Sequence, residues 1–357
     1  MGVSNMLNTI MNTAWDLLMN TVFYIMGITV LSGALGKLLI EFGVVRLLEI
    51  ILAPLMRPLF NLPGVASLAG VLTFLSDNPA IISLSNDKNF NKYFKKFELI
   101  SLTNFGTAFG MGLIVITFMS TLKIPGNTEN LFVAAMIGLF GALMGAVVST
   151  RLMQYLIKDI IKESDNNAVN KIQENISFKS EGSVFIRFLN SILDGGKSGV
   201  SLGLAIIPGV LIISTMVMML TFGVKDATIG YQGIAYEGVP LLPELAGKVW
   251  WLFEGLFGFK NPELIAFPIT SLGAVGASLS WVKAFIADGI VTGDTIAVFT
   301  AMGMCWSGYL STHTAMLDTL KFRELTSKAL ISHTIGGIFA GVIAHYCYLT
   351  MQYFLMS

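Results

Sequence analysis

The 357-residue chain carries little charge: only 12% of its residues are Asp, Glu, Lys or Arg, against roughly a quarter in an ordinary soluble domain. Hydrophobic residues make up 54% of the sequence, and glycine occurs 36 times. Glycine is more frequent in membrane helices than in soluble ones and permits close helix approach. The composition therefore predicts an all-α, polytopic transmembrane helical bundle in contact with the lipid bilayer.

Net charge and cysteine are equally scarce. The 22 basic and 22 acidic residues cancel, so the chain lacks the positive field that nucleic-acid binding requires. Cys305 and Cys347 lie in apolar segments without a C-x-x-C spacing, which argues against disulfides and a cysteine-built metal site. The first 15 residues contain no Lys or Arg, so a cleavable signal peptide is not expected.

Motifs for enzymatic chemistry are missing as well. The three histidines show no H-E-x-x-H or clustered spacing, and no Walker A or dinucleotide-binding glycine pattern occurs. We therefore expect no catalytic residue, no metal centre and no organic cofactor, and we expect that the chain is not an enzyme.

Apolar segments of about 20 residues mark candidate membrane spans. Eight segments meet this criterion: 17–39, 62–84, 99–122, 131–152, 202–222, 263–286, 295–317 and 331–355. Two shorter apolar segments, 44–60 and 241–259, contain charged residues. They fit short crossings, re-entrant pieces or interfacial helices.

An internal repeat recurs at an offset of 197 residues, which superposes Thr103 on Thr300 and Gly106 on Gly303. Weak internal symmetry is the usual signature of transporter architecture. We predict a first transmembrane repeat over 15–157 and a second over 200–355. The polar, charged stretch 158–199 is predicted to be a cytoplasmic connector, in which the helical apolar spacing at 184–193 fits an interfacial helix.

Basic residues in corresponding loops indicate that the two repeats are inverted. The loop 86–97 holds four lysines whereas 283–294 holds one, and the turn 122–130 holds one lysine whereas 319–328 holds three basic residues. Cytoplasmic loops carry the excess of Lys and Arg. Inversion requires an odd number of crossings per half, so we predict ten crossings, interrupted helices in each half and both termini outside.

The strongest local signal is the S-D-N-P sequence formed by Ser76, Asp77, Asn78 and Pro79 inside an apolar segment. Proline opens a membrane helix and frees backbone carbonyls, and an intramembrane carboxylate is expensive unless it has a function or a partner. A structural kink capped by Asp77 and Asn78 is the alternative. In the second half the corresponding segment has Pro268 followed by Thr270 and Ser271, without a carboxylate.

Polar residues on the following helices extend the candidate site. They are Thr103, Asn104 and Thr107 in the first half and Ser307, Ser311, His313 and Thr314 in the second. Such residues line a substrate or ion site in a transporter, but small polar side chains also serve ordinary helix packing, and His313 fits a structural histidine equally well.

The segment from Leu62 to Ala80, L-P-G-V-A-S-L-A-G-V-L-T-F-L-S-D-N-P-A, together with T-N-F-G-T-A-F-G from Thr103 to Gly110, resembles the nucleoside-recognition or Gate domain family. Gate domains occur in concentrative nucleoside transporters, in the membrane part of ferrous-iron transporters and in spore-maturation proteins. The resemblance implies a multi-pass protein of the bacterial plasma membrane with a transporter-like bundle. This chain lacks the GTP-binding domain of the iron transporters.

These observations favour a secondary transporter of a small polar solute, with a nucleoside-like solute as the first guess, a midplane site between broken helices and Na⁺ or H⁺ coupling. The alternative is a non-transporting scaffold or signalling subunit similar to the spore-maturation proteins. Glycine-rich faces at 138–145 and 336–341 favour a homodimer, although packing between these two helices explains them equally well.

Overall fold

A computed structural model describes residues 2–86, 88–126, 129–161 and 182–356, and these residues form helices and loops without a strand. The helices of the first half are α1 Val3–Asp16, η1 Leu17–Val22, α2 Phe23–Glu41, α3 Val44–Leu55, η2 Met56–Phe60, α4 Ala66–Leu75, α5 Pro79–Asn86, α6 Lys88–Asn91, α7 Lys96–Thr107, α8 Gly112–Thr121 and α9 Leu131–Ile157. Those of the second half are α10 Val184–Ala205, η4 Gly209–Ser214, α11 Thr215–Met219, α12 Leu241–Gly247, α13 Trp250–Phe257, η5 Pro262–Ile265, α14 Ala266–Ser271, α15 Val275–Ala287, α16 Gly293–Cys305, α17 Tyr309–Thr319, η6 Arg323–Leu325 and α18 Thr326–Met356.

Five helical runs are long and apolar enough to cross a membrane. They are Val3–Glu41, Lys96–Thr121, Leu131–Ile157, Val184–Met219 and Arg323–Phe354. The predicted all-α, polytopic membrane bundle is thereby confirmed, and the chain is a multi-pass membrane protein.

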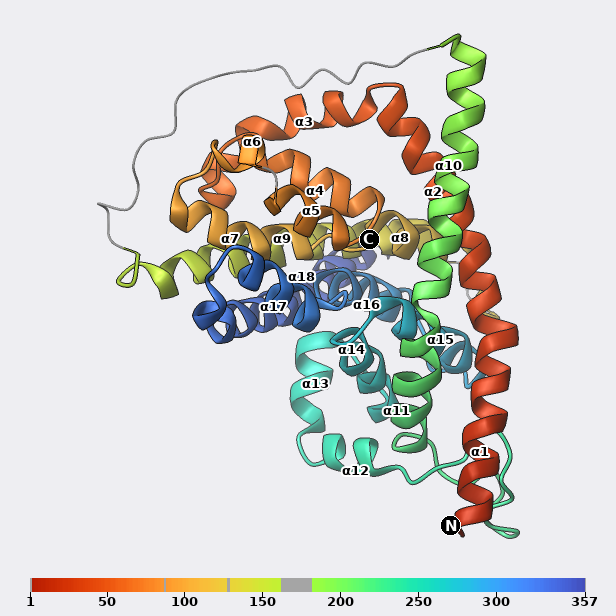
Figure 1. The fold of residues 1–357 in the computed structure, drawn as a ribbon. Helices are drawn as coiled ribbons and strands as arrows, with labels where there is room; N and C mark the ends of the chain where they lie inside the picture. The colour runs from red at the N-terminus through yellow and green to blue at the C-terminus, as the bar shows by residue number, and fades with distance from the viewer. Residues whose placement is uncertain (1, 87, 127–128, 162–181, 357) are drawn as a thin grey trace.

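Two long helical runs form an arm along one side of the molecule: α1, η1 and α2, drawn in red, lie beside α10, η4 and α11, drawn in green (Figure 1). Both runs begin earlier than the predicted spans 17–39 and 202–222. The stretch 184–193 is the start of α10, so the predicted boundary at 199 falls within this helix. Glycines along α10 allow its backbone to contact that of α2 closely. Gly195 and Gly199 lie before the predicted span at 202–222, so this contact stabilises the earlier start of the helix.

The core of the molecule contains α7, α9, α16 and α18, which pack against one another. A methyl group added at Gly145 would lie 2.5 Å from the Gly336 carbonyl oxygen, and one added at Gly141 would lie 2.6 Å from that of Ala340. The glycine-rich faces of α9 and α18 therefore serve contacts within the chain. They no longer give a reason to expect a homodimer.

The segments 62–84 and 263–286 form hairpins of half-helices. In each pair, α4 with α5 and α14 with α15, the two arms pack against each other. Their longest arm, α15, has 13 residues and spans about 20 Å, less than the roughly 30 Å of a bilayer core. The prediction that each of these segments crosses the membrane is wrong, because the break reverses the chain direction.

The two ambiguous apolar segments form short helices. The segment 44–60 forms α3 with 12 residues followed by η2 with 5, and 241–259 forms the short helices α12 and α13. A crossing helix needs about 20 residues. The helical run 44–60 has 17 residues and stands at the lower limit for a crossing helix, whereas α12 and α13 are too short, so the re-entrant or interfacial alternatives fit 241–259 better. With the two hairpins, the described helices do not supply ten crossings.

The polar connector predicted at 158–199 includes 162–181, which lies outside the described residues. The division of the chain into two repeats remains a prediction. The helix bounds are consistent with it: the offset of 197 places Leu131 on Lys328, near the start of α18, and Gly112 on Tyr309, where α17 begins.

Candidate functional site

The tips of the two hairpins are short interruptions, at 76–78 between α4 and α5 and at 272–274 between α14 and α15. Pro79 is the first residue of α5, a position where its missing N–H is tolerated. Pro268 lies in the first turn of α14, where a missing N–H is also tolerated, so it does not break that helix. The second interruption instead follows Ser271, and the predicted break at 267–271 is displaced towards the C-terminus.

Two further interruptions, which the sequence did not predict, occur at 108–111 between α7 and α8 and at 306–308 between α16 and α17. The residue immediately before the second helix is left-handed in both cases, with φ of 54° at Met111 and 60° at Gly308. A non-glycine residue with positive φ is uncommon. These two positions are separated by 197 residues, so the backbone conformation follows the repeat where the side chains differ.

All four interruptions meet at one cavity of about 440 Å³. Asp77 and Asn78 contribute from the first hairpin tip, Gly273 to Gly276 from the second, and Met111 and Ser307 from the two broken helices. The opposite wall comes from α10 and η4 and is aliphatic, with Ile206 and Ile213. The cavity thus lies between the arm and the core.

Polar atoms without partners face this region. Asp77 Oδ1 and Asn78 Oδ1 are buried and have no hydrogen-bond partner among the described residues. The Asn78 side-chain amide donates to the Ser307 carbonyl, which ties the first hairpin tip to the break between α16 and α17. Gly110 permits this contact, since a methyl group there would lie 2.6 Å from Asn78 Oδ1. Both side-chain oxygens therefore retain unused capacity to accept hydrogen bonds.

Of the residues predicted for the site, Asp77, Asn78, Ser307 and Ser311 line the cavity. Three others lie next to it in sequence, with hydroxyls that bond within their own helices: Ser76 donates to Leu72 O, Thr270 to Ala266 O and Ser271 to Phe267 O. Thr314 does not line the cavity, and its hydroxyl donates to Leu310 O at 2.9 Å.

Of the other predicted residues, Asn104, Thr107 and His313 belong to a separate buried network in the core. Thr103 is buried in the same helix, and its hydroxyl has no partner among the described residues. Asn104 Nδ2 lies 3.0 Å from Ser149 Oγ, 2.8 Å from Ser332 Oγ and 3.1 Å from the Ala329 carbonyl, which connects α7, α9 and α18. This network supports the structure of the core and does not line the cavity.

The network includes a pair of histidines whose rings lie 4.5 Å apart, His313 and His333. His333 Nε2 contacts the Cys305 carbonyl at 2.6 Å, so that nitrogen carries the proton, and Nδ1 accepts from Ser149 Oγ at 2.8 Å. The sequence gives no sign that Ser149, Ser332 and His333 are partners of this network, because they lie on α9 and α18, far along the chain from Asn104.

Asn104 provides a stability prediction. Replacing it with leucine keeps the volume but leaves the hydroxyls of Ser149 and Ser332 without their shared donor, so we expect a loss of about 1–3 kcal/mol. Thermal unfolding in detergent measures the effect. As a control, Thr117→Val should change little, since the Thr117 hydroxyl donates only to Leu113 O in its own helix. Equal unfolding temperatures for Asn104→Leu and the wild type would contradict the role of this network.

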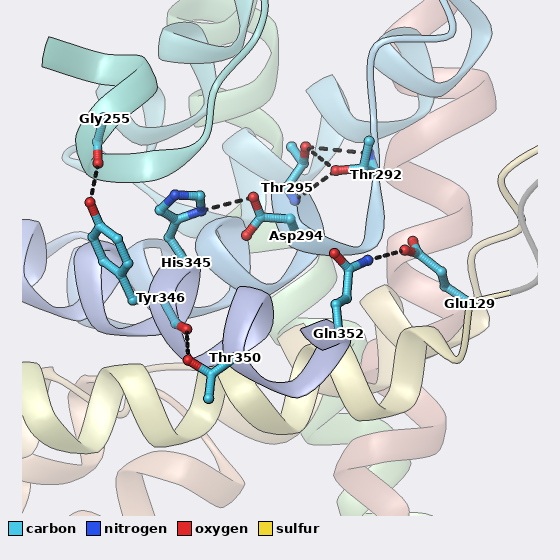
Figure 2. Close-up of polar contacts among 9 residues, drawn as sticks. All are labelled: Glu129, Gly255, Thr292, Asp294, Thr295, His345, Tyr346, Thr350 and Gln352. Carbon is cyan, nitrogen blue, oxygen red and sulfur yellow. Dashed lines mark hydrogen bonds and ion pairs between the residues drawn. The ribbon is translucent and has the colours of Figure 1, made fainter. Parts of the chain in front are cut away.

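A third polar cluster lies where α16 begins (Figure 2). None of its residues lines the cavity. His345 Nδ1 contacts Asp294 Oδ2 at 2.8 Å, and Glu129 accepts from the Gly293 N–H at 2.8 Å and from Gln352 Nε2 at 2.7 Å. Acidic groups stabilise a helix N-terminus. These contacts connect the start of α9, α16 and the end of α18 and explain His345 as a structural residue.

The fold is similar to solved structures of CNTnw, a concentrative nucleoside transporter. A variant in an outward-facing state gives a TM-score of 0.56 at 12% identity, covering 91% of this chain and 74% of that one. CNTnw in an inward-facing substrate-bound state gives 0.53 at 13% identity, covering 90% and 74%. No protein-family model and no curated protein matches the chain. The chain therefore has the fold of these structures.

Proposed function

We propose that this chain is a secondary transporter of a small polar solute, which binds in the cavity between the four helix interruptions. The observation that carries the proposal is the meeting of all four interruptions at one cavity. Its volume of about 440 Å³ lies in the range of ligand pockets, about 300–1,000 Å³. Interrupted helices in corresponding positions are typical of midplane sites in secondary transporters.

Asp77 supplies a means of coupling to Na⁺ or H⁺. It is the one charged residue among the described residues that line the cavity. A carboxylate at the centre of a membrane helix costs about 2.5–3.5 kcal/mol on insertion scales. A cation or a proton bound at Asp77 would offset this cost. Binding of the coupling ion and binding of the solute in the same cavity would therefore favour each other.

Nucleosides are the first class of solute to test, because the fold is that of a nucleoside transporter and the hairpin sequence resembles the Gate domain family. A base in this cavity would contact aliphatic side chains and the backbone of the hairpin tips. The aromatic residues Phe74, Phe105 and Phe109 line a different, apolar groove, and Trp306 does not line the cavity. The cavity therefore favours hydrogen bonding over aromatic stacking.

The hairpins allow inverted repeats with fewer crossings than the sequence indicated. Three crossings per half suffice: α1 to α2, α7 to α8 and α9 in the first, and α10 to α11, α16 to α17 and α18 in the second. The first hairpin then enters from the lysine-rich side and the second from the opposite side. This arrangement keeps both termini outside and leaves the basic loops 86–97 and 319–328 in the cytoplasm of a bacterial cell.

Cysteine labelling tests this topology. In a Cys347→Ser background, whose remaining Cys305 is buried, we expect Ser4→Cys to react with a membrane-impermeant thiol reagent in intact cells. Ser327→Cys should react only after permeabilisation, because it lies in the basic loop 319–328. The reverse pattern of reactivity would overturn the orientation.

Uptake into proteoliposomes tests the function. The purified protein is challenged with a panel of radiolabelled nucleosides, amino acids and sugars, under an imposed Na⁺ gradient, an imposed proton gradient or neither. We expect gradient-dependent accumulation of at least one polar solute. Failure of every solute to accumulate, with correctly folded protein, would favour the non-transporting scaffold.

A further inference from the structure

A second hollow, separate from the solute cavity, is an apolar groove of about 410 Å³ between α3, η2, α4, α7 and α9. Met56, Phe60, Phe74 and Phe105 form its floor, and Ser67 is the one polar side chain among the described residues that line it. The groove is open at α9, where Met136 and Phe140 are exposed. Since α9 is one of the helices long and apolar enough to cross a membrane, lipid acyl chains can reach the groove through this opening.

A positive charge lies at one end of the groove. The Arg151 guanidinium donates from Nε to the Leu59 carbonyl at 2.8 Å and from Nη2 to that of Pro58 at 2.7 Å, next to the groove residue Phe60. These bonds hold the side chain in a fixed orientation. Along α9, Arg151 lies eight residues beyond the groove residue Leu143, about 12 Å by helix geometry.

No carboxylate among the residues that the structure describes neutralises the charge of Arg151. Among the residues that the structure describes, Arg151 is exposed and contacts only carbonyl oxygens, with no carboxylate partner. The neighbouring Arg57, by contrast, is paired with the buried Glu98. A fixed guanidinium with free N–H groups recognises phosphate oxygens well. Basic sites beside membrane helices on the Lys/Arg-rich side are typical of anionic lipid headgroups.

From this arrangement we propose that the groove binds one anionic phospholipid, with an acyl chain between α3, α4 and α9 and its phosphate at Arg151. The charge of Arg151 would bind the lipid headgroup, and the apolar groove would bind the acyl chain. A zwitterionic lipid offers the same acyl chain but a headgroup with no net charge, so it should bind more weakly. The inference does not depend on the solute cavity or on transport.

Native mass spectrometry of the purified protein with added phosphatidylglycerol or phosphatidylcholine tests the proposal. We expect one retained phosphatidylglycerol per chain and at least tenfold weaker retention of phosphatidylcholine. Arg151→Gln should reduce the retention of phosphatidylglycerol about tenfold and that of phosphatidylcholine much less, because the choline charge already offsets its phosphate. Arg323→Gln, which removes an exposed arginine on the same predicted face, serves as the charge control and should retain the preference.

A groove-filling variant gives an independent test that does not involve the contacts of Arg151 with η2. Leu139→Trp places a larger side chain in the groove and should reduce the retention of both lipids, whereas Leu204→Trp on the exposed side of α10 should not. Equal retention of the two lipids by the wild type, or no effect of Leu139→Trp, would overturn the proposal. So would a dimer that dissociates on Leu139→Trp, because a second copy would then occupy the groove.

Discussion

Replacing Asp77 with asparagine is expected to abolish gradient-driven solute uptake while leaving the fold intact. The amide preserves the shape of the side chain and caps a helix about as well as the carboxylate. It removes the one charge among the described residues that line the cavity, together with the group that would bind Na⁺ or H⁺. A neutral amide is also cheaper to bury than a carboxylate, so thermal stability in detergent should be unchanged or higher.

Asp318→Asn is the matched control for this variant. Asp318 lies in the last turn of α17, is exposed and lies 3.8 Å from Arg323, so its loss should leave uptake unchanged. Uptake and its dependence on pH and Na⁺ are measured in proteoliposomes for both variants. Wild-type uptake with unaltered ion dependence in Asp77→Asn would remove the coupling role and leave Asp77 a structural residue at the hairpin tip.

The contact between α10 and α2 predicts the largest loss of stability. A methyl group added at Gly195 would lie 2.3 Å from the Gly33 carbonyl oxygen and 2.7 Å from Ala34 Cα. Both neighbours are backbone, so the two helices would have to separate. Overpacking typically costs about 1–3 kcal/mol, and we expect Gly195→Ala to reach the upper end of this range, as a large fall in the unfolding temperature.

The adjacent Gly196 provides the control. A methyl group there would lie 3.7 Å from Val30 Cγ1, an ordinary van der Waals distance. Alanine also favours helix over glycine by about 0.5–1 kcal/mol. Gly196→Ala should therefore be neutral or stabilising. Similar unfolding temperatures for the two alanine variants would show that the α2–α10 contact is looser than the structure indicates.

The sequence predicts the parts of this molecule that depend on composition and local chemistry. The apolar spans and the charge asymmetry of the loops indicate a polytopic helical bundle, and Pro79 with Asp77 and Asn78 indicates an interruption. These features depend on single residues: proline lacks a backbone N–H wherever it occurs, and a carboxylate is costly to bury in a membrane whatever its neighbours are. The offset of 197 residues superposes Asp77 on Ala274 at the second hairpin tip, but the sequence predicts the break itself at 267–271, around Pro268.

The direction of the chain after an interruption could not be predicted, because local sequence does not distinguish a kinked crossing from a hairpin. That choice depends on contacts between the two arms, as in α4 with α5. Hydropathy similarly gave no sign of the left-handed Met111, whose only signal is that the offset superposes it on Gly308. The separation of Asn104 and His313 from the cavity depends on Ser149 and Ser332, which only the tertiary fold brings together.

Substrate protection of a cysteine in the cavity wall tests most directly whether solute binds where the four interruptions meet. Ser311 lines the cavity and is exposed, whereas Thr314, three residues on, does not line it. In the Cys347→Ser background, modification of Ser311→Cys by a thiol reagent should block uptake, and saturating transported solute should slow the modification. Thr314→Cys should show neither effect. Modification of Ser311→Cys at the same rate with and without solute, and with uptake retained, would contradict the account.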